Sequence, residues 1–408
     1  MTYLNAKKYI FSLPSDIPCN EKRLSLLIDR AGLQQRLIKY VRLAGSNGKT
    51  VCAEMLMSVM KKAGYRVGCL RMPLRDEPRQ NICIDSLPQS METFAANTEL
   101  IRQIARDLEI EPNRSEVLLC LSLLSFKNAD CNFCIIESDH FGDDPSRFLP
   151  PPTAAVICGT IPNNDINEIS RIRSYIIKGI SEIVSAPQDS EAYKIISKTC
   201  YAANCRLTLP SKNAISVDKL SFRETRFVYK GKAYSVGLCG RFQVSNAVLL
   251  LETVDMLIRR GYKISYDAIS EGLSSLKIPA KFEVISVAPL IVIDSTHTPI
   301  AIQTVCDSFA DFGASTAKRV RLCLPCGDII PQYVSALTAR GYEIESVITK
   351  SEDSESAYGE YNVICEKSNK AIAKAAMREL DKSLVLMVSG EHSFVMPIRY
   401  EILSILGF

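Results

Sequence analysis

The fold is decided by the stretch Val41–Thr50, which reads VRLAGSNGKT. Its first four residues predict a short buried strand, and Gly45 and Gly48 predict a tight turn. From Lys49 the apolar spacing predicts a helix that runs to residue 63 and ends at Gly64, a residue type common at helix C-caps. A glycine turn between a strand and a helix presents successive backbone N–H groups to an anion, so we predict a phosphate-binding loop. The alternative is an ordinary strand–helix turn with a chance lysine.

Each residue of this loop has a predicted role in binding a nucleotide. The predicted cofactor-binding set in the loop is Gly45, Ser46, Asn47, Gly48, Lys49 and Thr50. The glycines let the backbone approach the phosphates. The Lys49 ammonium can neutralise the β- and γ-phosphate oxygens, and the Thr50 hydroxyl can bind Mg²⁺. We therefore expect ATP and Mg²⁺ as cofactors and count Lys49 among the catalytic residues.

The composition predicts a folded protein with more than one domain. The chain has 408 residues, above the size at which a single hydrophobic core usually stops growing, and 47% of them are hydrophobic. The net charge of +4 gives no reason to expect nucleic acid or an anionic membrane as a partner. Residues 1–8 lead into an amphipathic segment and not a secretory signal, and no apolar run approaches the ~20 residues that span a bilayer. We expect a cytoplasmic monomer.

The fifteen cysteines stand mostly among apolar neighbours, which favours free thiols in a reducing compartment. Two CxxC pairs, Cys131/Cys134 and Cys323/Cys326, could instead be the two halves of a zinc site. Each pair lies in a run that predicts a buried strand, and no histidine is close to either in sequence. We therefore favour core thiols over zinc ligands.

Alternating strands and helices predict an α/β fold. The buried strand at 132–137 and the helices that flank it indicate a parallel sheet covered on both faces. Short β-rich runs at 205–237 predict a small antiparallel addition, and a second α/β cycle starts at Leu290. We therefore predict a P-loop domain at 1–280, which includes the antiparallel addition, and a C-terminal α/β domain at 281–408.

Six short segments resemble the same family, in the same order along the chain. They are Ala44–Lys49, Ala63–Gly68, Ile135–Glu137, Gly240–Ala247, Pro279–Ile285 and Asp294–Pro299. The last two resemble Pro-Gly-Arg-Phe-Glu and Asp-Gly-Ala-His-Asn-Pro motifs. Together the segments resemble folylpolyglutamate synthase, of the Mur ligase superfamily, over nearly the whole chain. A strict P-loop would have glycine in place of Leu43, but the tighter Gly-x-x-Gly-Lys-Thr loop is the form that Mur-type ligases use.

The resemblance implies both a fold and a reaction. The fold is a P-loop, Mur-ligase-like central domain with a parallel sheet and a smaller, Rossmann-like C-terminal α/β domain. In the reaction, ATP phosphorylates a carboxylate of a folate, and the amine of glutamate attacks the acyl phosphate. The implied partners are therefore a nucleotide, a carboxylate and an amino acid.

The resemblance also assigns site residues outside the loop. Glu137 would bind Mg²⁺ together with Thr50. The cofactor-binding residues carried over from the family motifs are Asn246, Lys281, Asp294 and His297, and His297 is also expected to be catalytic.

Three positions depart from the family where the chemistry is expected. Met72 replaces a serine metal ligand, Asn164 replaces a histidine ligand, and Arg173 aligns with a lysine that is carbamylated in the family. A guanidinium stays protonated and cannot form a carbamate, but it can place a positive charge near the phosphates. We therefore count Arg173 among the catalytic residues and expect at most one Mg²⁺ beside the phosphates.

The sequence leaves three functions open. The leading hypothesis is an ATP-dependent ligase that adds an amino acid such as glutamate to a carboxylate acceptor. The second is a nucleotide-binding protein of the same fold that lacks ligase activity and serves as a regulator or partner subunit. The changes at Met72, Asn164 and Arg173 count against the standard chemistry. The third is a ligase with a non-folate acceptor.

Overall fold

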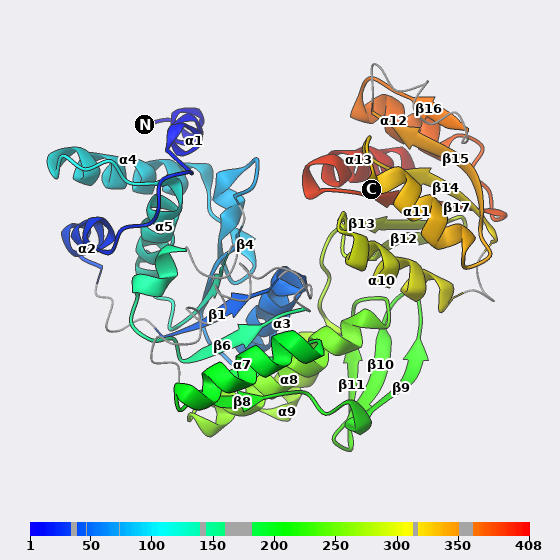
Figure 1. Ribbon diagram of the computed structural model, residues 1–408. Helices are drawn as coiled ribbons and strands as arrows, with labels where there is room; N and C mark the ends of the chain where they lie inside the picture. Colours follow the sequence, from blue (N-terminus) through cyan, green and yellow to red (C-terminus); the bar gives the residue numbers. More distant parts are fainter. Residues whose placement is uncertain are drawn as a thin grey trace. The chain divides into compact units, whose positions relative to one another are not determined.

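The chain forms two compact units, each made of two separate stretches of sequence (Figure 1). The first unit holds Met1–Asn213 and Asn246–Leu273, and the second holds Ala214–Ser245 and Ser274–Phe408. The computed structural model describes residues 1–33, 39–45, 47–72, 74–138, 144–159, 182–312, 317–350 and 362–408.

The first unit is built on an eight-stranded sheet. Its strands are β1 Tyr40–Ala44, β2 Val67–Leu70, β3 Ile82–Ile84, β4 Leu87–Pro88, β5 Phe133–Glu137, β6 Ala154–Ile157, β7 Glu182–Ser185 and β8 Arg206–Thr208. Their order across the sheet is β4-β3-β2-β5-β1-β6-β7-β8. In this order the six strands β2, β5, β1, β6, β7 and β8 pair in parallel with their neighbours. At the other end, β3 is antiparallel to both β2 and β4. Every residue of β1 and β5 is buried, as expected for central strands covered on both faces.

Helices lie on both faces of this sheet, and successive residues of a strand point to one face and then the other. The helices are α1 Tyr3–Ser12, α2 Glu21–Arg30, α3 Lys49–Lys62, α4 Met91–Asp107, α5 Arg114–Asn128, α7 Ser190–Ala202 and α9 Tyr266–Ser274, with the short 3-10 turns η2 Pro78–Asn81 and η3 Pro145–Phe148. The helices α1, α2, α4 and α5, which lie together in Figure 1, share a core with Tyr40, Leu70 and Ile136. Because neighbouring residues on a strand face opposite ways, Glu137 points to the other face, where α3 lies.

The second unit has a six-stranded sheet. Its strands are β12 Glu283–Val287, β13 Leu290–Asp294, β14 Arg319–Cys323, β15 Glu343–Thr349, β16 Val363–Cys365 and β17 Leu384–Ser389, and its helices are α10 Pro299–Ala310, α11 Ile329–Thr338, α12 Asn369–Met377 and α13 His392–Leu406. The order is β12-β13-β17-β14-β15-β16, in parallel except for β12. One apolar cluster joins Val292 to α10 and α11, and another joins Ile291 and Ile293 to α12 and α13.

A small antiparallel sheet lies inside the 205–237 segment. Its strands, which follow the 3-10 turn η4 Lys212–Ala214, are β9 Ile215–Leu220, β10 Thr225–Tyr229 and β11 Lys232–Val236. β10 is the middle strand and pairs antiparallel with both neighbours. None of the helices that the structure describes is long and apolar enough to cross a membrane.

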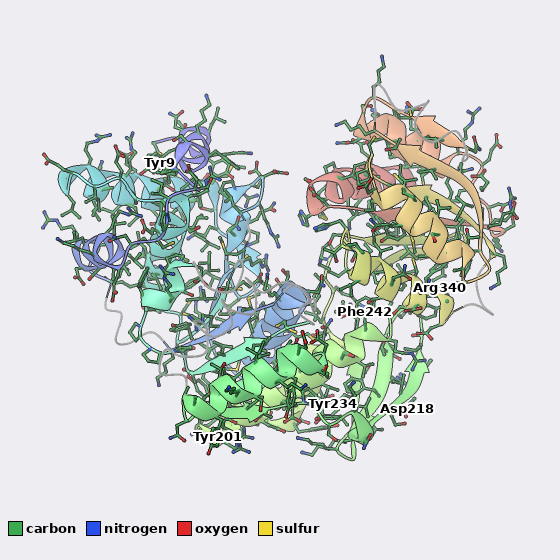
Figure 2. All side chains as sticks on the ribbon, viewed as in Figure 1. Tyr9, Tyr201, Asp218, Tyr234, Phe242 and Arg340 are labelled. Carbon is green, nitrogen blue, oxygen red and sulfur yellow. The ribbon has the colours of Figure 1, made fainter. Side chains whose placement is uncertain are left out.

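This small sheet belongs to the second unit, which differs from the predicted domains 1–280 and 281–408. The physical reason is aromatic packing. Phe222 stacks on Phe312 with ring centroids 4.6 Å apart, and Phe312 stacks in turn on Phe282. Phe242, labelled in Figure 2, meets Phe282 edge-on. The helix α8, Phe242–Arg259, then leads the chain back into the first unit.

Candidate functional site

The predicted phosphate loop lies at the carboxyl end of the central strand β1. The strand ends at Ala44 and α3 begins at Lys49. Between them the backbone turns through Gly45 at φ 138° and Gly48 at φ 82°, values that favour glycine. A Cβ at Gly45 would lie 1.7 Å from the carbonyl oxygen of Cys158, so no side chain fits there. The loop therefore presents bare backbone at this point.

Two segments distant in sequence approach the loop. A Cβ at Gly48 would lie 2.9 Å from Asn246 Oδ1, and a Cβ at Gly159 would lie 2.6 Å from the carbonyl oxygen of Asn47. Asn246 comes from α8, and Gly159 follows β6. The structure thus brings the predicted cofactor-binding residue Asn246 to the phosphate loop.

The side chains of Lys49 and Thr50 lie at the start of α3. Lys49 Nζ donates to the carbonyl oxygen of Gly45 over 2.8 Å, so the ammonium folds back over the loop. The Thr50 hydroxyl donates to Glu137 Oε2 over 3.3 Å. The residues predicted to bind Mg²⁺, Thr50 and Glu137, are therefore neighbours in the structure.

The Glu137 carboxylate is buried, with only 1% of its surface exposed. Burial raises its pKa, whereas the positive charges of Arg71, Arg75 and Lys49 lower it. Within the described part of the chain, Glu137 Oε1 has no hydrogen-bond partner. A buried carboxylate oxygen without a partner and a nearby hydroxyl are hard oxygen donors of the kind that Mg²⁺ prefers, so these two residues fit that ion.

Sequence reasoning missed a charged pair next to Glu137. Arg71 follows β2 and is 8% exposed, and its guanidinium forms an ion pair with Glu54 of α3. Burial lowers the pKa of Arg71. The signal that could have revealed the pair was an arginine directly after a fully apolar strand, since a charge at such a place needs a partner.

The other predicted cofactor-binding residues lie in the second unit, around the end of β13. Asp294 Oδ2 accepts a hydrogen bond from the backbone N–H of Phe282 over 2.7 Å, and Asp294 Oδ1 has no partner among the described residues. Burial raises the pKa of Asp294, while Lys281 acts in the opposite direction. Lys281 and Asp294 are therefore close enough to interact. His297 lies three residues further on and is exposed.

An ion pair holds the loop that carries Lys281. Arg399 of α13 donates to both oxygens of Glu283, each over 2.6 Å. Glu283 Oε2 also accepts from the backbone N–H of Ala280 over 2.8 Å, and the carbonyl of Ala280 accepts from the N–H of Ser295. This network joins the loop to the strand that ends in Asp294.

Some of the residues singled out in the sequence lie outside the described ranges, and others have surroundings that can now be described. Ser46, Asn164 and Arg173 lie outside the described ranges. Met72 is partly buried and packs against the apolar core of the first unit. All fifteen cysteines are free thiols. Among the described residues, no group of three or more histidine, cysteine, aspartate or glutamate side chains could hold a metal ion.

Comparison with known proteins gives a consistent set of relatives, although no protein-family model matches the chain. The chain is 24% identical over 320 residues to folylpolyglutamate synthase of Lacticaseibacillus casei, a match that covers 73% of this chain and 74% of that protein. It is 26% identical over 311 residues to a probable bifunctional folylpolyglutamate synthase/dihydropteroate synthase of Halobacterium salinarum, which covers 72% of this chain and 38% of that protein. The chain thus spans well under half of the bifunctional relative.

Solved structures match over almost the whole chain. The apo form of L. casei FPGS has a TM-score of 0.82 at 17% identity and covers 99% of this chain and 100% of its own. Mycobacterium tuberculosis folylpolyglutamate synthase complexed with ADP and AMPPCP has a TM-score of 0.79 at 20% identity, covering 98% and 99% respectively. These similarities confirm the predicted α/β fold.

Proposed function

We propose, on the premise that the chain is a folylpolyglutamate synthase-like and Mur-ligase-like protein, that it is an ATP-dependent ligase. It joins an amino acid such as glutamate to a carboxylate acceptor. The observation that carries this proposal is the loop at β1, where the backbone at Gly45 and Gly48, the Lys49 ammonium and the Thr50–Glu137 pair lie together. Backbone N–H groups and a lysine that bind phosphates, together with a hydroxyl that binds Mg²⁺, are the groups by which such loops bind a nucleoside triphosphate.

The residues of the first unit bind and orient the triphosphate. The glycines admit the phosphates to the backbone N–H groups at the start of α3. Lys49 exchanges its hydrogen bond with the Gly45 carbonyl for the phosphate oxygens. Thr50 and Glu137 would hold Mg²⁺, which neutralises phosphate charge when bound.

The residues of the second unit are proposed to contact the nucleotide as well. Lys281 offers a positive charge on a loop fixed by hydrogen bonds, and Asp294 offers a carboxylate oxygen without a partner among the described residues. His297 is exposed and so accessible to a ligand. Arg173 is proposed, from the sequence alone, to add a fixed positive charge near the γ-phosphate.

The proposed reaction has two steps. A carboxylate oxygen of the acceptor attacks the γ-phosphorus of ATP, and ADP leaves with the electron pair of the broken bond. The amine of the amino acid then attacks the acyl phosphate carbon, loses a proton and releases inorganic phosphate, which forms the amide. Both steps depend on neutralising phosphate oxygens, which is the role proposed for Lys49.

The test is an ADP-release assay with a panel of folates and other carboxylates, each combined with a panel of amino acids. We expect continued release of ADP over many turnovers only when an acceptor and an amino acid are both present, and at most one ADP per protein molecule with the acceptor alone. Lys49→Ala should remove the activity. If the wild-type protein binds AMPPCP but forms no ADP with any pair, the ligase proposal is wrong.

A second candidate function is nucleotide binding without ligation, as a partner subunit. The observation that favours it is Met72, which packs into the apolar core where the family has a metal-binding serine. Binding of AMPPCP without turnover in the same assay would support this candidate. A third outcome, turnover only with a non-folate carboxylate, would identify a ligase with another acceptor.

We further propose that the protein is a cytoplasmic monomer. The free thiols support a reducing compartment, because closely placed cysteines in an oxidising one tend to form disulfides. Light scattering of the purified protein at several concentrations tests the monomer, and cell fractionation tests the location.

A further inference from the structure

Arg71 lies beside Glu137 in the sheet of the first unit. The strands β2 and β5 pair in parallel as far as Leu70 opposite Ile136, and Arg71 and Glu137 are the next residues along each chain. The charge of Arg71 acts on the Glu137 carboxylate, which places the two side chains near each other. Both side chains point to the face that α3 covers. Arg71 reaches Glu54 of α3, and Glu137 accepts from Thr50 of the same helix.

The two side chains form a buried group with incomplete pairing. Arg71 is 8% exposed and Glu137 1% exposed. In the part of the chain that the structure describes, neither Arg71 Nε nor Glu137 Oε1 has a hydrogen-bond partner. A guanidinium keeps its proton in proteins, so Arg71 carries a permanent charge. That charge is shared between two carboxylates, those of Glu54 and Glu137.

An ionised Glu137 has opposite effects on the two ligands of the proposed site. It attracts a divalent cation, but it repels the phosphates that the loop binds. The carboxylate is close to the loop, because Glu137 Oε2 lies 3.3 Å from the hydroxyl oxygen of Thr50 at the start of α3. A buried positive charge on the adjacent strand offsets this repulsion, and electrostatic interactions are stronger in the interior than in water. The same charge disfavours a cation at Glu137.

We propose that Arg71 is a built-in counter-ion of the phosphate site, a positioning residue that balances Glu137 when no divalent cation is bound. It lets this chain hold a nucleoside triphosphate with only weak dependence on a divalent metal. Glu54 tunes the effect, because it competes with Glu137 for the guanidinium. The inference rests on the proposed function in one respect, that the loop at β1 binds the triphosphate.

The test measures the affinity of the full chain for AMPPCP by calorimetry, once in EDTA and once in Mn²⁺. For the wild type we expect the two dissociation constants to agree within about tenfold. In Arg71→Met, affinity in EDTA should fall by about tenfold or more, while affinity in Mn²⁺ stays the same or rises. Arg71→Lys, which keeps the charge, should retain most of the affinity in EDTA.

A second variant gives the opposite sign. Glu54→Gln removes the competitor for Arg71, so it should raise affinity in EDTA and reduce the gain from Mn²⁺. Arg66→Met is the matched control, since Arg66 is exposed and pairs with Asp85 at 3.5 Å, and it should change neither value. If Arg71→Met fails to fold, Glu54→Gln decides alone, and an unchanged gain from Mn²⁺ in that variant overturns the proposal.

Two further results would overturn the inference, and they are distinguishable. Equal losses in EDTA and Mn²⁺ for Arg71→Met would show that Arg71 acts only on the structure. No binding of AMPPCP by the wild type under either condition would show that the loop is not a triphosphate site, so the proposed function would fail together with the inference.

Discussion

The loop after β1 in the first unit and the loop before β12 in the second differ in how they hold unusual backbone. In the first, the left-handed positions are Gly45 and Gly48. In the second, they are Ala280 and Phe282, at φ 53° and 52°, although left-handed backbone is unfavourable for such residues. Yet each loop lies beside a buried carboxylate with one oxygen that lacks a partner among the described residues, Glu137 in one case and Asp294 in the other.

The two loops are held by different interactions with the surrounding chain. At Gly45 another backbone segment lies where a Cβ would be, so the loop can be built only without a side chain. At Ala280 the left-handed conformation is held by hydrogen bonds to Glu283 and from Ser295, and the methyl group is fully buried. The first loop thus depends on close approach of backbone, and the second on a network of bonds.

Gly45→Ala should have the largest effect, because it breaks the first loop itself. A Cβ would lie 1.7 Å from the carbonyl oxygen of Cys158, so the free energy of unfolding should fall by about 3 kcal/mol or more. Urea unfolding followed by circular dichroism measures this. The matched control is Gly64→Ala, at φ 86° with nothing near its Cβ, which should cost only about 1–2 kcal/mol. Similar losses in both variants would contradict the role of close approach.

Lys49→Ala should leave the first loop folded but remove its charge. We expect the dissociation constant for AMPPCP to rise about a hundredfold, the size of one lost charged hydrogen-bonding partner. Stability should change by less than about 1 kcal/mol, because the hydrogen bond that Lys49 donates within the described part of the loop goes to the Gly45 carbonyl and can be replaced by water. Calorimetric titration measures the affinity, with Lys61→Ala on the same helix as the control. An unchanged affinity would remove the phosphate-loop assignment.

Asp294→Asn tests the carboxylate of the second loop through pH. Burial raises the pKa of Asp294 in the folded protein, so the native state resists ionisation while the unfolded state ionises above about pH 4. The wild type therefore loses stability as pH rises above that value, and the neutral variant does not. We expect Asp294→Asn to be more stable than the wild type at pH 7 and equal to it near pH 3. A difference independent of pH, measured by urea unfolding, would contradict this.

Ala280→Gly should have the smallest effect. Glycine relieves the cost of the left-handed backbone, about 1 kcal/mol, but it loses a buried methyl group and makes the unfolded chain more flexible. These terms oppose each other, so the free energy of unfolding should change by less than about 1 kcal/mol. A loss above about 2 kcal/mol in urea unfolding would mean that the methyl group, and not the hydrogen bonds, holds the second loop.

The local elements of the first loop could be predicted because their signals are short in range. The strand predicted at Val41–Ala44 is observed at Tyr40–Ala44, and the helix predicted from Lys49 begins there and ends at Lys62. Glycine at each turn and the apolar spacing of the helix act within a few residues, so they can be read without knowledge of the fold.

The charged group at Glu137 could not be predicted in the same way. The position of Arg71 near Glu137 depends on the register of β2 against β5, in which the preceding residues Leu70 and Ile136 are paired, and that register is set by packing between distant parts of the chain. The compact units differ from the predicted domains for a similar reason. Phe222 and Phe312 are ninety residues apart in sequence, and no local pattern indicates that they stack, so sequence proximity alone predicts that the small sheet belongs to the first domain.

The chain's passage from the first unit to the second and back has a consequence for its synthesis on the ribosome. The second unit starts at Ala214, before the first is finished at Leu273. When Phe222 leaves the exit tunnel, its stacking partner Phe312 has not yet been translated. During synthesis, Phe222 beside the small sheet therefore lacks its stacking partner while α8 and α9 are added to the first unit. A nascent chain stalled at residue 280 would leave Phe222 without this partner, and it would be a natural target for chaperones that bind apolar segments.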